Sequence, residues 1–400
     1  MTASKAWEFA VLAAAAAAAA PNDPRLWGFS VTPGENSVRA IAAFGLTQPE
    51  VPVGDPSPAP PETRVLDKER GAENNAVVDE LSPELETSVA KGLAWLARQQ
   101  APDGSFGNQQ QWGPNVAVTS LSALAFMSDG HLPDRGAYGP VVSKALGYIL
   151  ANAADNGLIA SDAGAAPMYG HGFATIFLGE IYGMSAGGPD TATAARVHDA
   201  LVRSVRLIVS SQNEEGGWRY NPVPNDADVS VTICQIKGLR SARNAGIEVP
   251  RETIDRAVEY VKKCQNAGRG GDGGFRYQLT GNPASGFARS AAGVASLQYA
   301  GVYDDKAVRE GLAYIERSRG GQRAGRAQHY YYGHYYAMQT MYLAGGTWWA
   351  KWWPDMRDEL LGLQKDDGSW DDNQVGDHYG TAMALIILQS PKRYLPIFQR

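Results

Sequence analysis

Two kinds of apolar pattern alternate along the chain from about residue 81 onward. In the first kind, apolar residues recur every three or four positions and leave one face polar, as at Val89, Leu93 and Leu96. Such a striped helix has one face in water, whereas a helix that is apolar nearly all round is buried on both sides. Runs of the second, nearly uniform kind are 116–127, 229–239, 288–299 and 381–388. The pattern therefore predicts repeated units of an outer helix, a turn and an inner helix.

A short signature joins the two helices in four of these units. It is a Gln followed, after a turn that contains Gly, by an aromatic residue, and it occurs at Gln100 and Phe106, Gln212 and Trp218, Gln265 and Phe275, and Gln364 and Trp370. We expect each Gln amide to bond backbone groups at a neighbouring helix end while the aromatic ring covers them.

Two further units lack the Gln but keep the order of a striped run and a uniform run, at 142–150 with 170–178 and at 308–315 with 333–343. Tandem units of about 50 residues indicate a repeat architecture. No atypical capping repeat is evident at either end, which favours a closed ring over an open solenoid. The sequence thus predicts an all-α fold, an α6/α6 toroid of six helix pairs around a central cavity, over residues 81–400.

The first eighty residues have a different composition. Lys5 precedes an apolar stretch from Ala10 to Ala20 that is long enough for the h-region of a signal peptide and too short to span a bilayer. Residues 1–20 are therefore interpreted as a signal peptide for export to the periplasm or envelope, with an Ala-rich tail of a cytoplasmic protein as the alternative. Residues 21–80 include six prolines between positions 48 and 64, which predicts a poorly ordered linker.

Charge and cysteine content exclude several classes of function. The net charge is −6 and no dense run of Lys or Arg occurs, so nothing indicates a nucleic-acid partner. Only Cys234 and Cys264 are present, each inside a helical pattern, which excludes a disulfide framework and a Cys-based zinc cluster. No cofactor is predicted, and the sequence does not indicate an oligomeric state.

The Gln–aromatic repeats on alternating outer and inner helices resemble the α/α-toroid superfamily of terpenoid cyclases and prenyltransferases. This superfamily includes squalene and oxidosqualene cyclases, protein prenyltransferase β subunits and thioester-containing complement domains. The resemblance covers about Leu81 to Arg400 and is strongest to single-toroid squalene-cyclase-like proteins of bacteria. It implies a central cavity that binds an apolar, isoprenoid ligand.

The resemblance to squalene cyclases implies a proton donor, the middle Asp of an Asp-x-Asp-Asp-Thr motif at the start of an inner helix. This chain reads Asp-Ala-Asp-Val-Ser-Val-Thr from Asp226 to Thr232, so that in register Asp228 matches the first Asp and Ser230 replaces the donor. A Ser cannot protonate an alkene, and we expect no squalene-cyclase activity. Two alternatives stay open: a shifted register in which Asp226 or Asp228 is catalytic, or helix N-caps at these positions.

Two other chemistries of the superfamily find no match in register. Prenyltransferase β subunits hold zinc with an Asp-x-Cys pair and a His, and complement thioesters need a Cys followed by Gly-Glu-Gln; both motifs are missing. No metal is predicted, although four residues at inner-helix starts would face one mouth of the ring: His171, His334, Asp377 and His378. They suit zinc binding or acid–base work, or else helix-end capping and packing.

Aromatic residues cluster near the fifth inner helix. Tyr332, Tyr335 and Tyr336 are expected to line the ligand cavity together with the residues at the mouth. Tryptophans between positions 348 and 353 predict either a patch for peripheral contact with a membrane or a packed seam of the ring.

Several functions fit these features. The favoured one is binding of an apolar small molecule, of the isoprenoid class that the resemblance implies, without squalene-cyclase activity. The alternatives are a terpenoid cyclase or transferase that uses Asp228 or the His-rich mouth, and an envelope toroid that binds other proteins. A glycan-active barrel would require paired carboxylates, for which Asp226, Asp228, Asp371 and Asp377 are the candidates.

Overall fold

The computed structural model describes residues 80–108, 113–161, 166–185, 191–322 and 327–399. The predicted signal peptide and nearly all of the predicted linker lie outside the described residues. Within these ranges the chain forms twelve α-helices and no β-strand. No helix in the described part of the chain is both long and apolar enough to cross a membrane.

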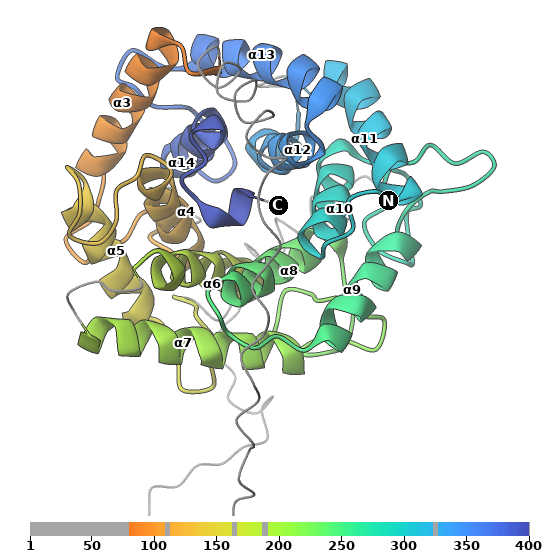
Figure 1. Cartoon of the computed structure of the whole chain (residues 1–400), viewed down its shortest axis with the longest axis horizontal. Helices are drawn as coiled ribbons and strands as arrows, with labels where there is room; N and C mark the ends of the chain where they lie inside the picture. Colours follow the sequence, from red (N-terminus) through yellow and green to blue (C-terminus); the bar gives the residue numbers. More distant parts are fainter. Residues whose placement is uncertain (1–79, 109–112, 162–165, 186–190, 323–326, 400) are drawn as a thin grey trace, which may run out of the picture.

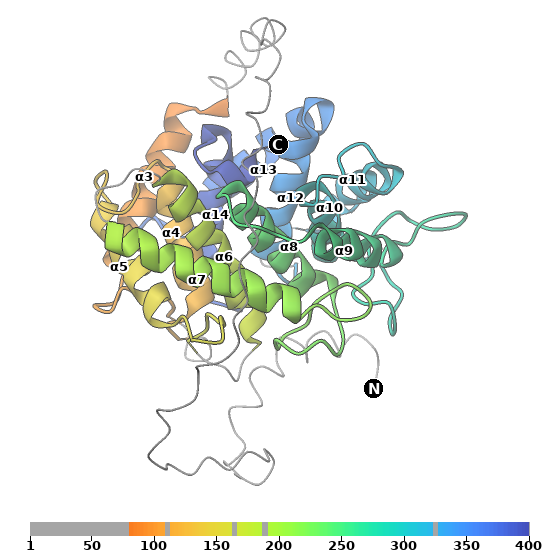
Figure 2. The same cartoon turned by 60° about the horizontal axis from the view of Figure 1, so that its bottom comes forward.

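The helices form two concentric layers (Figures 1 and 2). The outer helices are α3 (Pro83–Arg98), α5 (Gly139–Ala151), α7 (Thr191–Ser210), α9 (Arg251–Lys263), α11 (Lys306–Ser318) and α13 (Gly346–Leu363). The inner helices are α4 (Val116–Met127), α6 (Pro167–Met184), α8 (Val229–Asn244), α10 (Phe287–Tyr299), α12 (Tyr330–Ala344) and α14 (Asp377–Leu388). Outer and inner helices therefore alternate along the chain, as predicted.

The inner helices form a closed circle. Each contacts the next one in the chain, and the last, α14, also contacts α4 and α3 at the beginning of the domain. Nearly every residue of α4 is buried, whereas α9 buries only Thr253, Ala257, Tyr260 and Val261. This difference in burial is what the uniform and striped patterns predicted. The predicted all-α toroid is confirmed.

The four signature glutamines link successive outer helices. Gln212 Nε2 donates to Gly216 O at 2.8 Å in its own turn and to Thr253 O at 2.9 Å in the next outer helix. The same pair of bonds recurs from Gln100 to Gly104 and Val141, from Gln265 to Gly273 and Ala307, and from Gln364 to Gly368 and Ser88. Because Ser88 lies on α3, the Gln364 bonds tie the last outer helix to the first.

The aromatic residue of each signature lies between the two layers. Trp218 Nε1 donates to Ile208 O at 2.7 Å, and its backbone N–H donates to Thr232 Oγ1 on the inner helix. Gly216, in the same turn, has φ +100°, and a Cβ there would lie 2.3 Å from Arg256 O. Only glycine fits this turn, since a side chain would require both a strained backbone and a shift of α9.

Candidate functional site

The inner helices all begin at one end of the ring, which we term the mouth. One tyrosine from each of five successive repeats lies there, half-buried: Tyr169, Tyr220, Tyr277, Tyr332 and Tyr379. The rings of Tyr169 and Tyr220 are 6.1 Å apart, and the hydroxyls of Tyr220 and Tyr277 are 2.5 Å apart. Burial and, to a smaller extent, the nearby Tyr332 raise the pKa of Tyr169, and burial together with the nearby Tyr379 raises that of Tyr332. We term these five residues the tyrosine mouth.

An acidic and a basic side chain lie among these rings. Asp228 is fully buried and caps α8, because its Oδ1 accepts the Val231 N–H at 2.9 Å. Arg219 Nε lies 3.6 Å from Asp228 Oδ2, and the guanidinium stacks 4.5 Å from the Tyr220 ring centre and 5.5 Å from that of Tyr277. Burial raises the pKa of Asp228 to about 6, and Arg219 partly offsets this increase. The mouth thus contains a carboxyl group that gains or loses a proton near neutral pH.

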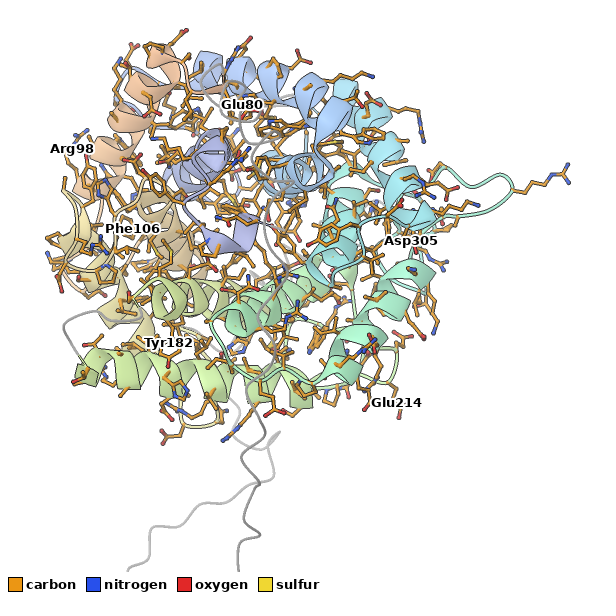
Figure 3. All side chains as sticks on the ribbon, viewed as in Figure 1. Glu80, Arg98, Phe106, Tyr182, Glu214 and Asp305 are labelled. Atoms are coloured by element: carbon orange, nitrogen blue, oxygen red, sulfur yellow. The ribbon has the colours of Figure 1, made fainter. Side chains whose placement is uncertain are left out.

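Side chains cross the ring below the mouth. Tyr332 donates its hydroxyl to Ser230 O at 2.9 Å. One turn further down, the Tyr336 hydroxyl lies 3.4 Å from Cys234 Sγ. Tyr335 and Tyr336 are fully buried, and side chains occupy the inside of the ring in Figure 3. We expected these two tyrosines to line an open cavity, but they fill the ring at this level because their hydroxyls reach across to α8.

His171 and His334 belong to the wall between the two helix layers. His171 Nδ1 accepts the Ile159 N–H at 3.2 Å, and its Nε2 lies 3.3 Å from Ser204 O on α7. His334 Nε2 lies 3.1 Å from Gln322 O. Burial lowers the pKa of both rings to about 4, so they are neutral. Each of these histidines belongs to one of the two repeats that lack the signature Gln, and its hydrogen bonds link the inner helix to the outer layer.

The predicted cluster at the mouth does not form. His378 Nδ1 accepts the Gly107 N–H at 3.0 Å, and its ring packs edge-on against Trp95. Asp377 lies 3.5 Å from Lys365 Nζ, which Asp371 also approaches. Among the described residues, no group of three or more His, Cys, Asp or Glu side chains could hold a metal ion. The expectation that these three histidines and Asp377 gather is wrong, because each makes its own local bonds.

The tryptophans of α13 pack against the repeats on both sides, since the Trp352 ring centre lies 5.4 Å from the guanidinium of Arg319, just after α11. Trp349, Trp352 and Trp353 are buried, and the rings of Trp349 and Trp353 stack 4.9 Å apart. Trp349 Nε1 also donates to Glu80, just before α3. Of the two alternatives, the geometry of these three residues fits the packed seam.

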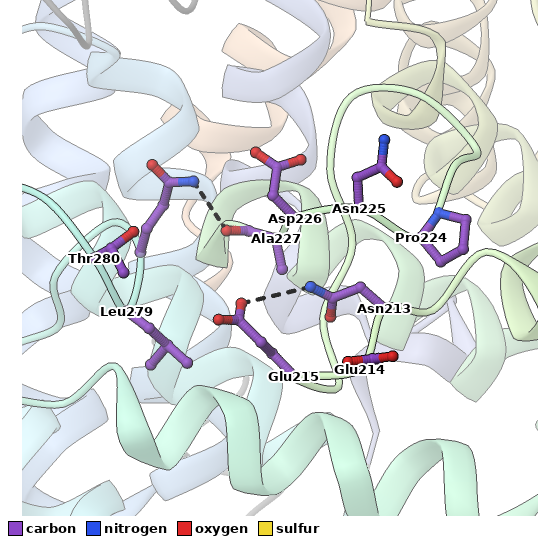
Figure 4. Close-up of a pocket in the computed structure, with 10 residues that line it drawn as sticks. Asn213, Glu214, Glu215, Pro224, Asn225, Asp226, Ala227, Leu279 and Thr280 are labelled. Atoms are coloured by element: carbon purple, nitrogen blue, oxygen red, sulfur yellow. Dashed lines mark hydrogen bonds between the residues drawn. The ribbon is translucent and has the colours of Figure 1, made fainter.

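A polar pocket of about 290 Å³ lies next to the tyrosine mouth (Figure 4). Its walls carry the carboxylates Glu214, Glu215 and Asp226, and Gln278 donates across it to Ala227 O at 3.2 Å. Asp226 Oδ2 is also 3.4 Å from Arg219 Nη1, which connects the pocket to the mouth. The surface beside the mouth is therefore acidic.

Most residues of the tyrosine mouth escaped the sequence analysis, although a pattern marks them. Arg-Tyr follows the signature aromatic twice, as Arg219-Tyr220 and Arg276-Tyr277. Tyr-Gly begins three inner helices, at Tyr169, Tyr332 and Tyr379. Aligning the repeats beyond the Gln–aromatic signature would have placed all five tyrosines at the same level of the ring.

Comparisons with known proteins support the fold. No protein-family model matches the chain, and no curated protein matches its sequence. Cellobiose 2-epimerase from Bacillus thermoamylovorans is similar in structure, with a TM-score of 0.54 and 13% identity over 80% of this chain and 100% of the epimerase chain. D-mannose isomerase gives a TM-score of 0.53 and 10% identity over 77% of this chain and 98% of its own.

A third similar structure is the type II terpene cyclase MstE from Scytonema. Its TM-score is 0.50 and its identity 14%, over 78% of this chain and 99% of the cyclase chain. Variants of that cyclase have been solved with the substrate geranylgeranyl dihydroxybenzoate and with the product merosterolic acid A. All three neighbours are α/α toroids, so the chain has a terpenoid-cyclase-like toroid fold.

Proposed function

We propose that this protein binds an apolar, isoprenoid-type ligand against the tyrosine mouth and does not cyclise squalene. The observation that carries this proposal is the convergence of five half-buried tyrosines from successive repeats at one end of the ring. Aromatic faces provide large apolar surfaces, while hydroxyl groups can stay hydrogen-bonded at the edge. A fold neighbour that has been solved with a geranylgeranyl substrate supports the choice of ligand class.

Equilibrium binding of radiolabelled geranylgeraniol tests the proposal. Aromatic contacts of this kind are worth about 1 kcal/mol each, so replacing Tyr332 and Tyr379 together by Ala should weaken binding roughly tenfold or more. Tyr314→Ala is the matched control, because Tyr314 lies on the outer helix α11 and should not contact the ligand. Equal affinities for the wild type and the double variant would reject the mouth as the binding site.

The case against squalene cyclisation rests on acid strength. Ser230 is at the position where the resemblance implies a proton donor, and the nearest buried acid is Asp228, with a pKa of about 6. An acid of that strength is a poor proton donor to an unactivated alkene. Incubation with squalene and gas chromatography of the extract should therefore recover squalene alone.

Acid-initiated chemistry is the second candidate function, because Asp228 is buried among aromatic rings and titrates near neutral pH. It requires a substrate that is more basic than an alkene, such as an epoxide. Turnover of an isoprenoid epoxide by the wild type, abolished in Asp228→Asn, would favour this function over binding alone.

A further inference from the structure

The last residues of the chain close the end of the ring opposite the mouth. After α14 the chain passes through two short 3-10 helices, η4 (Ser390–Lys392) and η5 (Pro396–Phe398). The second contacts α6 and α8, and in Figure 1 the dark blue end of the described chain lies near the middle of the ring. Leu395, Ile397 and Phe398 are each at most 4% exposed. We term residues 395–399 the C-terminal plug.

The plug covers a buried carboxyl and a buried amine. Glu180 Oε2 on α6 accepts the Ile397 N–H at 3.1 Å, while its Oε1 accepts the Ser241 hydroxyl at 2.7 Å. Lys237 Nζ donates to the Tyr335 hydroxyl at 2.6 Å and lies 4.7 Å from the centre of the Phe398 ring. Burial raises the pKa of Glu180 to about 7 and lowers that of Lys237 well below its usual range.

Glu180 and Lys237 have no part in binding at the mouth. Tyr169 and Glu180 both lie on α6, and their eleven-residue offset corresponds to about 16 Å along the helix. Tyr335 and Tyr336 fill the ring between the two levels. Burying an amine and a carboxyl costs free energy that apolar side chains of similar size would not. A packed core alone therefore does not account for Glu180 and Lys237.

The plug is held to the ring by few bonds. It adds one backbone hydrogen bond to Glu180 and a few apolar side chains. Short segments with few bonds to the rest of a fold can open locally at less than the global free energy of unfolding. Opening would expose Glu180, Lys237 and the aromatic rings beside them.

We propose that Ile397 and Phe398 occupy a second ligand site. This site accepts a mainly apolar molecule that carries one neutral N–H or O–H donor. The donor of such a ligand binds Glu180 Oε2, in place of the Ile397 N–H. Its apolar part covers Lys237, in place of the Phe398 ring, next to Tyr299, whose ring centre is 5.3 Å from Nζ. The plug is then a built-in competitor for the site. The inference takes the apolar ligand class from the proposed function but concerns other residues.

Fluorescence titration with N-phenyl-1-naphthylamine tests this site, because the probe is neutral and has apolar rings and one N–H donor. The full-length double variant Ile397→Pro with Phe398→Ala loses both the backbone donor and the ring that fill the site. Its Kd for the probe should be at least about tenfold lower than that of the wild type. A synthetic peptide with the sequence of residues 394–399 should displace the probe from the double variant. Tyr394→Ala is the matched control, since Tyr394 is 51% exposed and precedes the plug, and it should leave the Kd unchanged.

An unchanged Kd in the double variant, or a peptide that fails to compete, overturns the proposal. Adding Glu180→Leu to the double variant removes the hydrogen-bond acceptor and should return the Kd for the probe to the wild-type value. If the probe instead binds a loosened core, the Kd of this triple variant stays low, which contradicts the proposal. Adding Tyr332→Ala should leave the gained affinity intact. Failure of mouth binding in the wild type would therefore not affect this result.

Discussion

Replacing Trp370 tests how the ring is closed. Trp370 belongs to the last repeat, is fully buried, and donates from Nε1 to Leu360 O at 2.8 Å. Its ring packs closely against the first outer helix, since a Cβ on Gly92 of α3 would come within 2.7 Å of Trp370 Cζ3. The side chain therefore contacts both ends of the domain.

Two substitutions separate the packing of Trp370 from its hydrogen bond. Trp370→Ala removes a fully buried ring and should lower the free energy of unfolding by about 3 to 5 kcal/mol. Trp370→Phe keeps most of the ring but leaves Leu360 O without its indole donor, which should cost about 1 to 3 kcal/mol. The order of stability should be wild type, Phe variant, Ala variant.

Urea denaturation followed by far-ultraviolet circular dichroism measures these differences. Trp348→Ala is the control, because Trp348 is a half-buried residue of the neighbouring helix α13 and its loss should cost less than about 1 kcal/mol. If Trp370→Ala unfolds at the same urea concentration as the wild type, Trp370 does not hold the ring together and the closure described here is incorrect.

Three further predictions concern the turns and the mouth. Gln364→Ala removes the bonds to Ser88 O and Gly368 O and should lower the free energy of unfolding by about 1 to 3 kcal/mol in urea; no loss would show that these bonds are dispensable. Gly216→Ala forces a side chain into a turn at φ +100° and 2.3 Å from Arg256 O, and should lower the melting temperature, whereas an unchanged value would contradict the described turn. The folded pKa of Asp228, about 6, exceeds the unfolded value of about 3.9, so its contribution is complete below pH 4 and is lost as the pH rises to 6. Relative to Asp228→Asn, the wild type should lose roughly 2 kcal/mol between pH 4 and pH 7, and parallel stability curves for the two proteins would refute the raised pKa.

The fold was predictable because each repeat carries its own local signal. Striped and uniform apolar runs distinguish the outer from the inner helices, and the Gln–aromatic turns recur in register. Both signals depend on contacts within one repeat or between neighbours, which the sequence pattern reflects directly.

The site was less predictable because it depends on contacts across the ring. Whether Tyr335 lines a cavity or fills it is decided by Lys237, 98 residues earlier in the chain. His171 and Ser204 show the same limit, since a His at an inner-helix start can face the mouth or the outer layer, and helical spacing alone does not choose between them. Arg219 and Asp228 were separated by loop residues whose path the apolar pattern does not specify.

A crystal structure of the protein with geranylgeraniol tests the central claim most directly. The account predicts electron density for the isoprenoid chain against the rings of Tyr169, Tyr332 and Tyr379, at the starts of α6, α12 and α14. Density found only elsewhere on the molecule, or an empty tyrosine mouth at a ligand concentration that saturates binding in solution, would contradict it.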